Sequence, residues 1–200
     1  DSYWANVQNR QTHNSGEHQL FQCSPVRICE MNDASDNHGD QENTLSTYSV
    51  DIETLQQAAL AGDPQALFQL AINYEQGRGV AENHQEAFYC YHQAAELGHV
   101  TAQLNLGWAY SNGIGVPQDN DKAFYWYQKA ARQGHPTAQF DLGFCYINGL
   151  GVEKDEHQAI SWYTKAAEQG HAVAQLNLGW IYANSSTQQN WEQAVYWYRH

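Results

Sequence analysis

Three histidines, His99, His135 and His171, are the residues whose type and spacing first suggest chemistry. They recur every 36 residues, and imidazole serves both as a zinc ligand and as a general base near neutral pH. Each follows a glycine at the end of an Ala-rich segment, where a turn after a helix is expected. Successive histidines are then two helices apart, and packed helices lie about 8–10 Å from each other, whereas zinc holds its ligands at about 2 Å. The spacing therefore favours turn residues that hydrogen-bond between repeats.

Other motifs of catalysis or ligand binding are incomplete in this sequence. The Gly113-Ile-Gly115 turn follows an expected helix instead of a strand, and Gln118 stands where a dinucleotide-binding fingerprint needs a third glycine. Asp141 and Glu153 lack a second carboxylate at a fixed short spacing, and neither G-x-S-x-G nor HExxH occurs. An active site also needs unlike residues that converge in one place, which a repetitive chain does not favour. We expect no catalytic residue, no metal and no cofactor, and hence no enzyme.

The cysteines do not form a recognisable framework. Cys90 and Cys145 fall in different repeats on faces expected to pack, which indicates buried free thiols. The polar segment before residue 50 adds further cysteines and histidines whose spacing matches no standard zinc pattern: His13, His18, Cys23, Cys29 and His38.

The charge balance limits the classes of partner. The chain has 9 basic and 22 acidic residues, a net charge of −13, which repels nucleic acid and anionic membranes. No apolar run approaches the roughly 20 residues that span a bilayer, so membrane insertion is not expected. The acidity equally suits a role in keeping a repeat protein soluble. The chain starts at Asp1 without a charged-then-apolar leader, which suggests a processed chain or a fragment, either cytoplasmic or exported.

Internal repetition is the dominant feature of the sequence. The segment AQLNLGWAY at 102–110 returns as AQFDLGFCY at 138–146 and as AQLNLGWIY at 174–182, with a weaker copy at 66–74. A second segment, AFYWYQKAARQGH at 123–135, also recurs at 87–99 and 159–171. A fixed period of this length indicates a solenoid built of stacked repeats.

Each repeat is predicted to be a helix–turn–helix pair. On a helical wheel Ala102, Leu106 and Tyr110 share one face, and Trp126 and Tyr127 share a face in the second segment. The glycines of the turn can end the first helix, and any of three residues can cap the second: Asp119, Asn120 or Asp121. Glycines recur within the first helix, where we expect the backbone of a neighbouring helix to approach closely: Gly107, Gly143 and Gly179.

These motifs resemble a known family. The run A-x-x-x-LG-x-x-Y, G-x-GV and KA-x-x-WY-x-KAA-x-x-GH is similar to the Sel1-like repeat, a relative of the tetratricopeptide repeat, and covers about Gln65 to His200. Departures are Ala71 in place of the glycine, Cys90 in place of the tryptophan, and residues 184–190 in place of the two-glycine turn. The resemblance implies an all-α, right-handed α-solenoid.

The expected organisation follows from this period. We predict a disordered polar leader (1–49), an N-terminal capping half-repeat helix (50–63), and repeats at 64–99, 100–135, 136–171 and 172–200, the last truncated. A final helix that stops at His200 leaves an aromatic face uncovered, so further repeats or another domain are expected beyond it. We expect a monomer unless the edge of the C-terminal helix pairs.

The resemblance also suggests where a partner binds. In tetratricopeptide repeats the corresponding arc of the first helix lines a concave groove that holds peptides. Here it comprises Thr101, Leu104, Trp108, Asn112, Thr137, Phe140, Phe144, Asn148, Leu176, Trp180 and Asn184. Two alternatives stay open, because Leu104 and its equivalents can instead pack against the next repeat, and Asn112 and Asn148 can simply end the helix.

Taken together, the sequence predicts a non-catalytic protein–protein interaction scaffold. It would bind a peptide or a partner helix on the concave face, with protein or peptide as its only partner class. The alternatives are an accessory or regulatory module of a cell-envelope hydrolase and a purely structural spacer.

Overall fold

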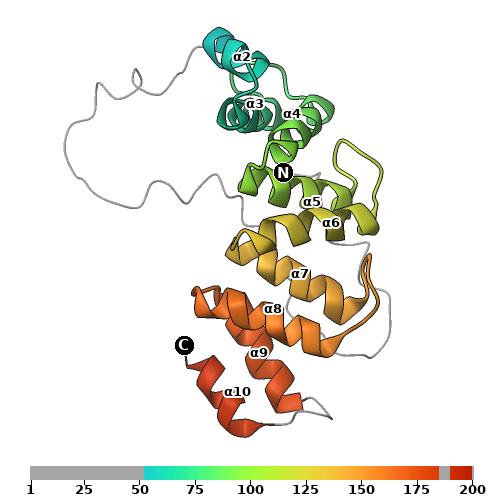
Figure 1. Cartoon of the computed structure of the whole chain (residues 1–200), viewed down its shortest axis with the longest axis vertical. Helices are drawn as coiled ribbons and strands as arrows, with labels where there is room; N and C mark the ends of the chain where they lie inside the picture. Colours follow the sequence, from blue (N-terminus) through green and yellow to red (C-terminus); the bar gives the residue numbers. More distant parts are fainter. Residues whose placement is uncertain (1–51, 185–189, 200) are drawn as a thin grey trace, which may run out of the picture.

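The computed structural model describes residues 52–184 and 190–199. The predicted leader, with its cysteines and histidines, lies outside the described residues. All regular secondary structure within the described ranges is helical, and Figure 1 shows the helices stacked in chain order from α2 at one end to α10 at the other. They are α2 (Ile52–Leu60), α3 (Pro64–Gln76), α4 (His84–Glu96), α5 (Val100–Asn112), α6 (Asn120–Arg132), α7 (Pro136–Asn148), α8 (Glu156–Glu168), α9 (Ala172–Asn184) and α10 (Trp191–Tyr198).

Short polar residues and glycines set where the helices begin and end. Of the three candidate caps before α6, Asp119 is the one used, and its side chain accepts a hydrogen bond from the backbone N–H of Lys122 at 3.0 Å. Gly113 and Gly149 end α5 and α7 with φ values of 70° and 71°, the left-handed conformation expected at these turns. The predicted helix–turn–helix repeat is therefore confirmed.

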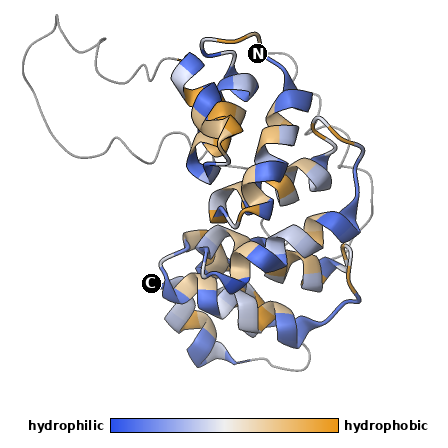
Figure 2. Cartoon of the chain, turned by 45° about the horizontal axis from the view of Figure 1, so that its top comes forward, coloured by the Kyte–Doolittle hydropathy of each residue, from blue (hydrophilic) through white to orange (hydrophobic). Residues whose placement is uncertain are grey.

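The core extends along the stack in two clusters, one from α2 to α7 and one from α7 to α10, instead of being gathered at one centre. Extensive helix-to-helix contact within the described ranges joins only helices that follow one another in the chain. Figure 2 shows apolar segments between the packed helices and hydrophilic segments on the outside and in the turns. This arrangement is an α-solenoid, in which each repeat buries its apolar face against its neighbours.

The glycines within the first helices make room for an aromatic ring. A Cβ atom added to Gly107 would lie 2.7 Å from Cδ1 of Tyr127, and one added to Gly143 would lie 2.8 Å from Cδ1 of Tyr163. The prediction that a helix backbone approaches these glycines is therefore wrong for Gly107 and Gly179, whose nearest atoms belong to a tyrosine ring of the paired helix, whereas at Gly143 the main-chain carbonyl of Ala159 would also lie 3.2 Å from the added Cβ. A helical wheel places the tyrosine on the correct face but does not show which atoms come closest.

Close backbone contact also occurs at the second glycine of two turns, Gly115 and Gly151. Gly115 has φ 69° and Gly151 has φ 67°, and a Cβ on either would collide with the main-chain carbonyl of the preceding repeat's second helix. The carbonyl belongs to His84 for Gly115 and to Asn120 for Gly151. Because these glycines lack a side chain, both turns can contact the main chain of the preceding repeat directly.

Buried glutamines tie three consecutive helices together. Gln103 on α5 donates from Nε2 to the carbonyl of Ala95 at 3.0 Å and accepts at Oε1 from Nε2 of Gln133 at 2.7 Å. Gln139 repeats the arrangement, with Gln169 as its donor. The carbonyls of Ala95 and Ala131, near the ends of α4 and α6, also accept from the backbone N–H groups of Gly98 and Gly134, so each glutamine adds a second donor.

Candidate functional site

The predicted concave residues lie on three helices of equal length, α5, α7 and α9. Positions spaced by three or four residues share one side of a helix, and the 36-residue period places equivalent residues on successive first helices. The candidate face is defined as the members of this set that remain open to solvent: Thr101, Trp108, Asn112, Thr137, Phe144, Asn148, Leu176, Trp180 and Asn184.

Two predicted members are buried and do not belong to the candidate face. Leu104 is 3% exposed and Phe140 is 2% exposed. The ring of Phe140 stacks on His171 with centroids 4.8 Å apart. Both side chains are therefore part of the packed core, and the ring contacts of Phe140, with Tyr163 and His171, lie within its own repeat. Leu176, at the equivalent position on α9, is 43% exposed.

The three asparagines each serve the end of their own helix. The Nδ2 group of Asn112 donates to the carbonyl of Trp108 at 2.9 Å. Asn148 and Asn184 make the same bond to the residues four positions earlier. All three side chains are exposed, so a partner can reach them, but one donor of each amide is already engaged.

The candidate face includes three aromatic residues, at one position of successive first helices. Trp108, Phe144 and Trp180 are all partly exposed. Within the described chain Trp108 and Phe144 make no ring–ring or cation–π contact. Phe144 packs partly against the core between α7 and α10, whereas Trp108 belongs to neither core cluster. Large, partly exposed aromatic side chains are typical binding hot spots, and Trp108 is the most available of the three.

One residue of this region was missed by the sequence analysis as a candidate site residue. Asp141 lies on α7, one turn from both Thr137 and Phe144. It is half-buried and makes no hydrogen bond or ion pair with a described residue. Burial raises the pKa of its carboxyl to about 7. The sequence does distinguish Asp141 from its counterparts, because the equivalent residues of α5 and α9 are the uncharged Asn105 and Asn177.

The recurring histidines serve the helix junctions. His99 accepts at Nδ1 from the backbone N–H of Ala102 in the next repeat at 3.1 Å, and its Nε2 lies 3.0 Å from Oε1 of Gln65 in its own repeat. The predicted hydrogen bond between repeats is therefore confirmed at His99. Burial lowers the pKa of His99, His135 and His171. Across 52–184 and 190–199, no group of three or more His, Cys, Asp or Glu residues is placed to hold a metal ion.

The two described cysteines are buried free thiols, as predicted. Burial is the main cause that raises the pKa of Cys90 to about 11 and that of Cys145 to about 12. Because the thiolate is the reactive form, both are inert near neutral pH.

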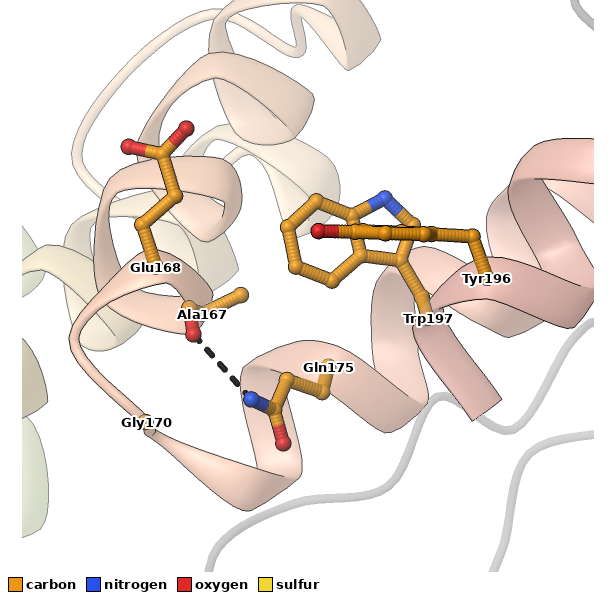
Figure 3. Close-up of a pocket in the computed structure, with 6 residues that line it drawn as sticks. All are labelled: Ala167, Glu168, Gly170, Gln175, Tyr196 and Trp197. Carbon is orange, nitrogen blue, oxygen red and sulfur yellow. Dashed lines mark hydrogen bonds between the residues drawn. The ribbon is translucent and has the colours of Figure 1, made fainter. Parts of the chain in front are cut away.

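A pocket in the last repeat lies away from the candidate face. Figure 3 shows it between the end of α8 and the helices α9 and α10, where Gln175 donates to the carbonyl of Ala167 at 3.1 Å. Its lining is Ala167, Glu168, Gly170, Gln175, Tyr196 and Trp197. In the two preceding repeats the equivalent glutamine also accepts a hydrogen bond from Gln133 or Gln169. At the pocket, Gln175 makes no such second bond with a described residue.

Comparison with known proteins identifies the architecture. The family model of the Sel1 repeat matches four consecutive stretches, residues 64–99, 100–135, 136–171 and 172–199. The chain belongs to the Sel1 repeat family. Proteins of this family are generally non-catalytic scaffolds for protein–protein interaction. No curated protein sequence matches the chain.

Solved structures of Sel1 repeat proteins resemble this one. A protective antigen of uropathogenic Escherichia coli strains is 37% identical, with a TM-score of 0.72 over 75% of this chain and 32% of that chain. A Sel1 repeat protein from Oxalobacter formigenes is 34% identical, with a TM-score of 0.69 over 74% of this chain and 61% of that chain. Cysteine rich protein B of Helicobacter pylori is 26% identical, with a TM-score of 0.50 over 63% and 96%. This Sel1 repeat chain therefore spans about a third of the first relative and 61% of the second.

Among the helices that the structure describes, none is long and apolar enough to cross a membrane.

Proposed function

We propose that this Sel1 repeat chain is a non-catalytic scaffold that binds an extended peptide or a partner helix on the candidate face of α5, α7 and α9. Partner binding on stacked repeats requires side chains that point away from the core at regular intervals. Trp108, Phe144 and Trp180 meet this requirement, because they recur at one position of successive first helices and stay partly exposed. Their recurrence is the observation on which the proposal rests.

The composition of the first helices supports a peptide partner. Helices α5 and α9 contain no charged residue, and their open positions carry hydroxyl, amide and aromatic groups. Amides and hydroxyls can pair with the N–H and C=O groups that an extended backbone leaves free. Aromatic rings supply apolar contact area at a low cost in conformational entropy.

Peptide selection tests the proposal even while the natural partner is unidentified. Peptides would be selected from a random display library on the full 200-residue chain, and their affinities measured by fluorescence polarisation. Trp108→Ala combined with Trp180→Ala should weaken the selected peptides by about 30-fold, the effect of losing a hot-spot residue. Far-UV circular dichroism should show unchanged helicity.

Tyr125→Ala is the matched control, since Tyr125 is an exposed aromatic residue on a second helix, α6. Equal affinity in the control and in the tryptophan variant would rule out the candidate face. If the chain acts only as a structural spacer, no peptide will be selected. If it is an accessory module of a cell-envelope hydrolase, it should instead alter the turnover of that enzyme when added to it.

A further inference from the structure

Asp141 is the only charged side chain on the three helices of the candidate face, α5, α7 and α9. No lysine or arginine occurs on these helices or on α3, so none of them offers a cation to pair with it. A half-buried carboxylate normally has a cation or several N–H donors as partners. Asp141 has neither among the described residues.

The surroundings of Asp141 are aromatic and weakly acidic. Tyr127 of α6 and Tyr163 of α8 interact with its charge, as does Cys145 on its own helix. None of these groups carries a positive charge, and each disfavours a second negative charge nearby. Phe144 adds a partly exposed ring one turn further along α7. A cation that reached this position would meet a carboxylate and an aromatic face together.

We propose that Asp141 is a specificity-determining residue that selects peptides carrying a basic side chain, with arginine preferred. This inference rests on the proposed binding function of the candidate face and names the chemistry of its partner. Arginine is preferred over lysine because its planar guanidinium forms paired hydrogen bonds to a carboxylate and also stacks on aromatic rings. The net charge of −13 attracts a basic peptide over longer distances.

The equivalent positions explain why a single site is expected. Asn105 and Asn177 stand where Asp141 stands on α7, and an amide neither repels nor strongly attracts a cation. Of the three helices of the candidate face, only α7 therefore carries a charge, which fixes the register of a bound peptide relative to the stack. The neighbouring repeats contribute contacts that tolerate many sequences.

Two synthetic peptide pools test this inference on the full chain. Both have randomised flanks of uncharged residues, and one has arginine at the centre while the other has citrulline, which keeps the shape but lacks the charge. We expect the arginine pool to bind at least about tenfold more tightly, the usual scale of a charge-assisted hydrogen-bonded pair. Asp141→Asn should remove this difference, whereas Glu153→Gln, which neutralises an exposed carboxylate in a turn, should preserve it.

The pH dependence supplies a second measurement that a merely structural role would not affect. Affinity for the arginine pool should rise between about pH 6 and about pH 8, as Asp141 ionises, and stay flat in Asp141→Asn. Carboxyl-carbon NMR should show the pKa of Asp141 fall from about 7 when the arginine pool is added.

Each outcome separates the two proposals. Equal binding of both pools, with no effect of Asp141→Asn, would overturn the role of Asp141 and leave the candidate face intact. Failure of both pools to bind the unmodified chain would overturn peptide binding and this inference with it.

Discussion

Replacing Asp141 with asparagine should stabilise the fold at and above neutral pH. The carboxyl has a pKa of about 7 in the folded chain against an ordinary value of 3.8. Each unit of difference corresponds to about 1.4 kcal/mol, so the ionised carboxylate costs the fold at most about 4 kcal/mol. Part of the side chain remains open to solvent, which lowers the expected gain to about 1–3 kcal/mol. Asparagine fits, since Asn105 and Asn177 occupy the equivalent positions.

The sign of the pH dependence follows from where the proton is held. Between about pH 4 and pH 7 the folded chain keeps a proton on Asp141 that the unfolded chain has already lost. The free energy of unfolding should therefore fall as the pH rises through this window, and the loss is complete above about pH 7. The variant lacks this carboxyl, so its advantage over the natural chain should grow across the same window, by up to about 1.4 kcal/mol per pH unit.

Urea unfolding followed by circular dichroism, at intervals from about pH 5 to about pH 8, measures this difference. Comparison of the two chains cancels the contribution of groups they share, including the buried His99, His135 and His171. The exposed Glu153→Gln variant should show a difference that does not change with pH. A constant difference for Asp141→Asn, or a variant less stable at about pH 8, would refute the assigned environment of Asp141.

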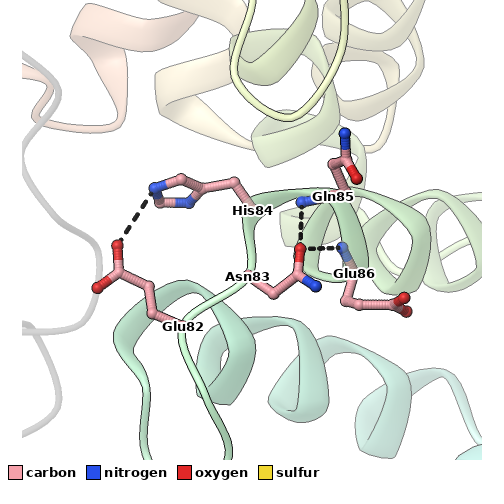
Figure 4. Close-up of polar contacts among 5 residues, drawn as sticks. All are labelled: Glu82, Asn83, His84, Gln85 and Glu86. Atoms are coloured by element: carbon pink, nitrogen blue, oxygen red, sulfur yellow. Dashed lines mark hydrogen bonds and ion pairs between the residues drawn. The ribbon is translucent and has the colours of Figure 1, made fainter.

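Three further substitutions test the packing of the repeats, each by urea or thermal unfolding. Gly107→Ala places a methyl group 2.7 Å from the ring of Tyr127 and should destabilise the fold by about 1–3 kcal/mol. Gln103→Leu removes the side-chain donor to the carbonyl of Ala95, which keeps the backbone N–H of Gly98 at 3.1 Å, and should cost about 1 kcal/mol. Asn83 caps α4 by accepting from two backbone N–H groups, as Figure 4 shows, so Asn83→Ala should cost about 1 kcal/mol.

Matched changes distinguish these causes from general damage. Adding Tyr127→Leu to Gly107→Ala should recover part of the loss, because the ring that the new methyl group meets is removed. Leu67 occupies the position of Gln103 in the first repeat, so a large loss in Gln103→Leu reflects the missing hydrogen bond and not the shape. Asn83→Ser keeps a capping oxygen and should retain most of the stability. The assigned contacts would be refuted if the double variant were no more stable than Gly107→Ala, or if Asn83→Ser lost as much stability as Asn83→Ala.

The fold was predictable because repetition adds independent evidence for each element. The spacing of Leu106 and Tyr110, the turn at Gly113 and the cap at Asp119 each agree with one helix–turn–helix unit, and the copies at 64–99 and 136–171 repeat the agreement. What failed depends on contacts between side chains. The wheel could not show that the ring of Tyr127 fills the space at Gly107.

The candidate site was predictable only to the level of a face. The arc of Trp108 and its equivalents follows from helical spacing, whereas the burial of Leu104 and Phe140 depends on the helices that pack over them. Asp141 has no partner carboxylate at a fixed spacing, so the sequence pattern gives it no catalytic role. Its unusual pKa comes from burial between α6, α7 and α8, and a linear pattern does not reveal desolvation.

At the turns of Gly115 and Gly151, the contact with the preceding repeat involves main-chain atoms. Gly115 meets the carbonyl of a histidine and Gly151 that of an asparagine, yet the geometry is alike. This contact therefore does not depend on which amino acid lies opposite the glycine. An array of this kind can be lengthened by in-frame duplication of a 36-residue cassette, and its outward-facing residues can diverge from copy to copy without altering how the copies are joined.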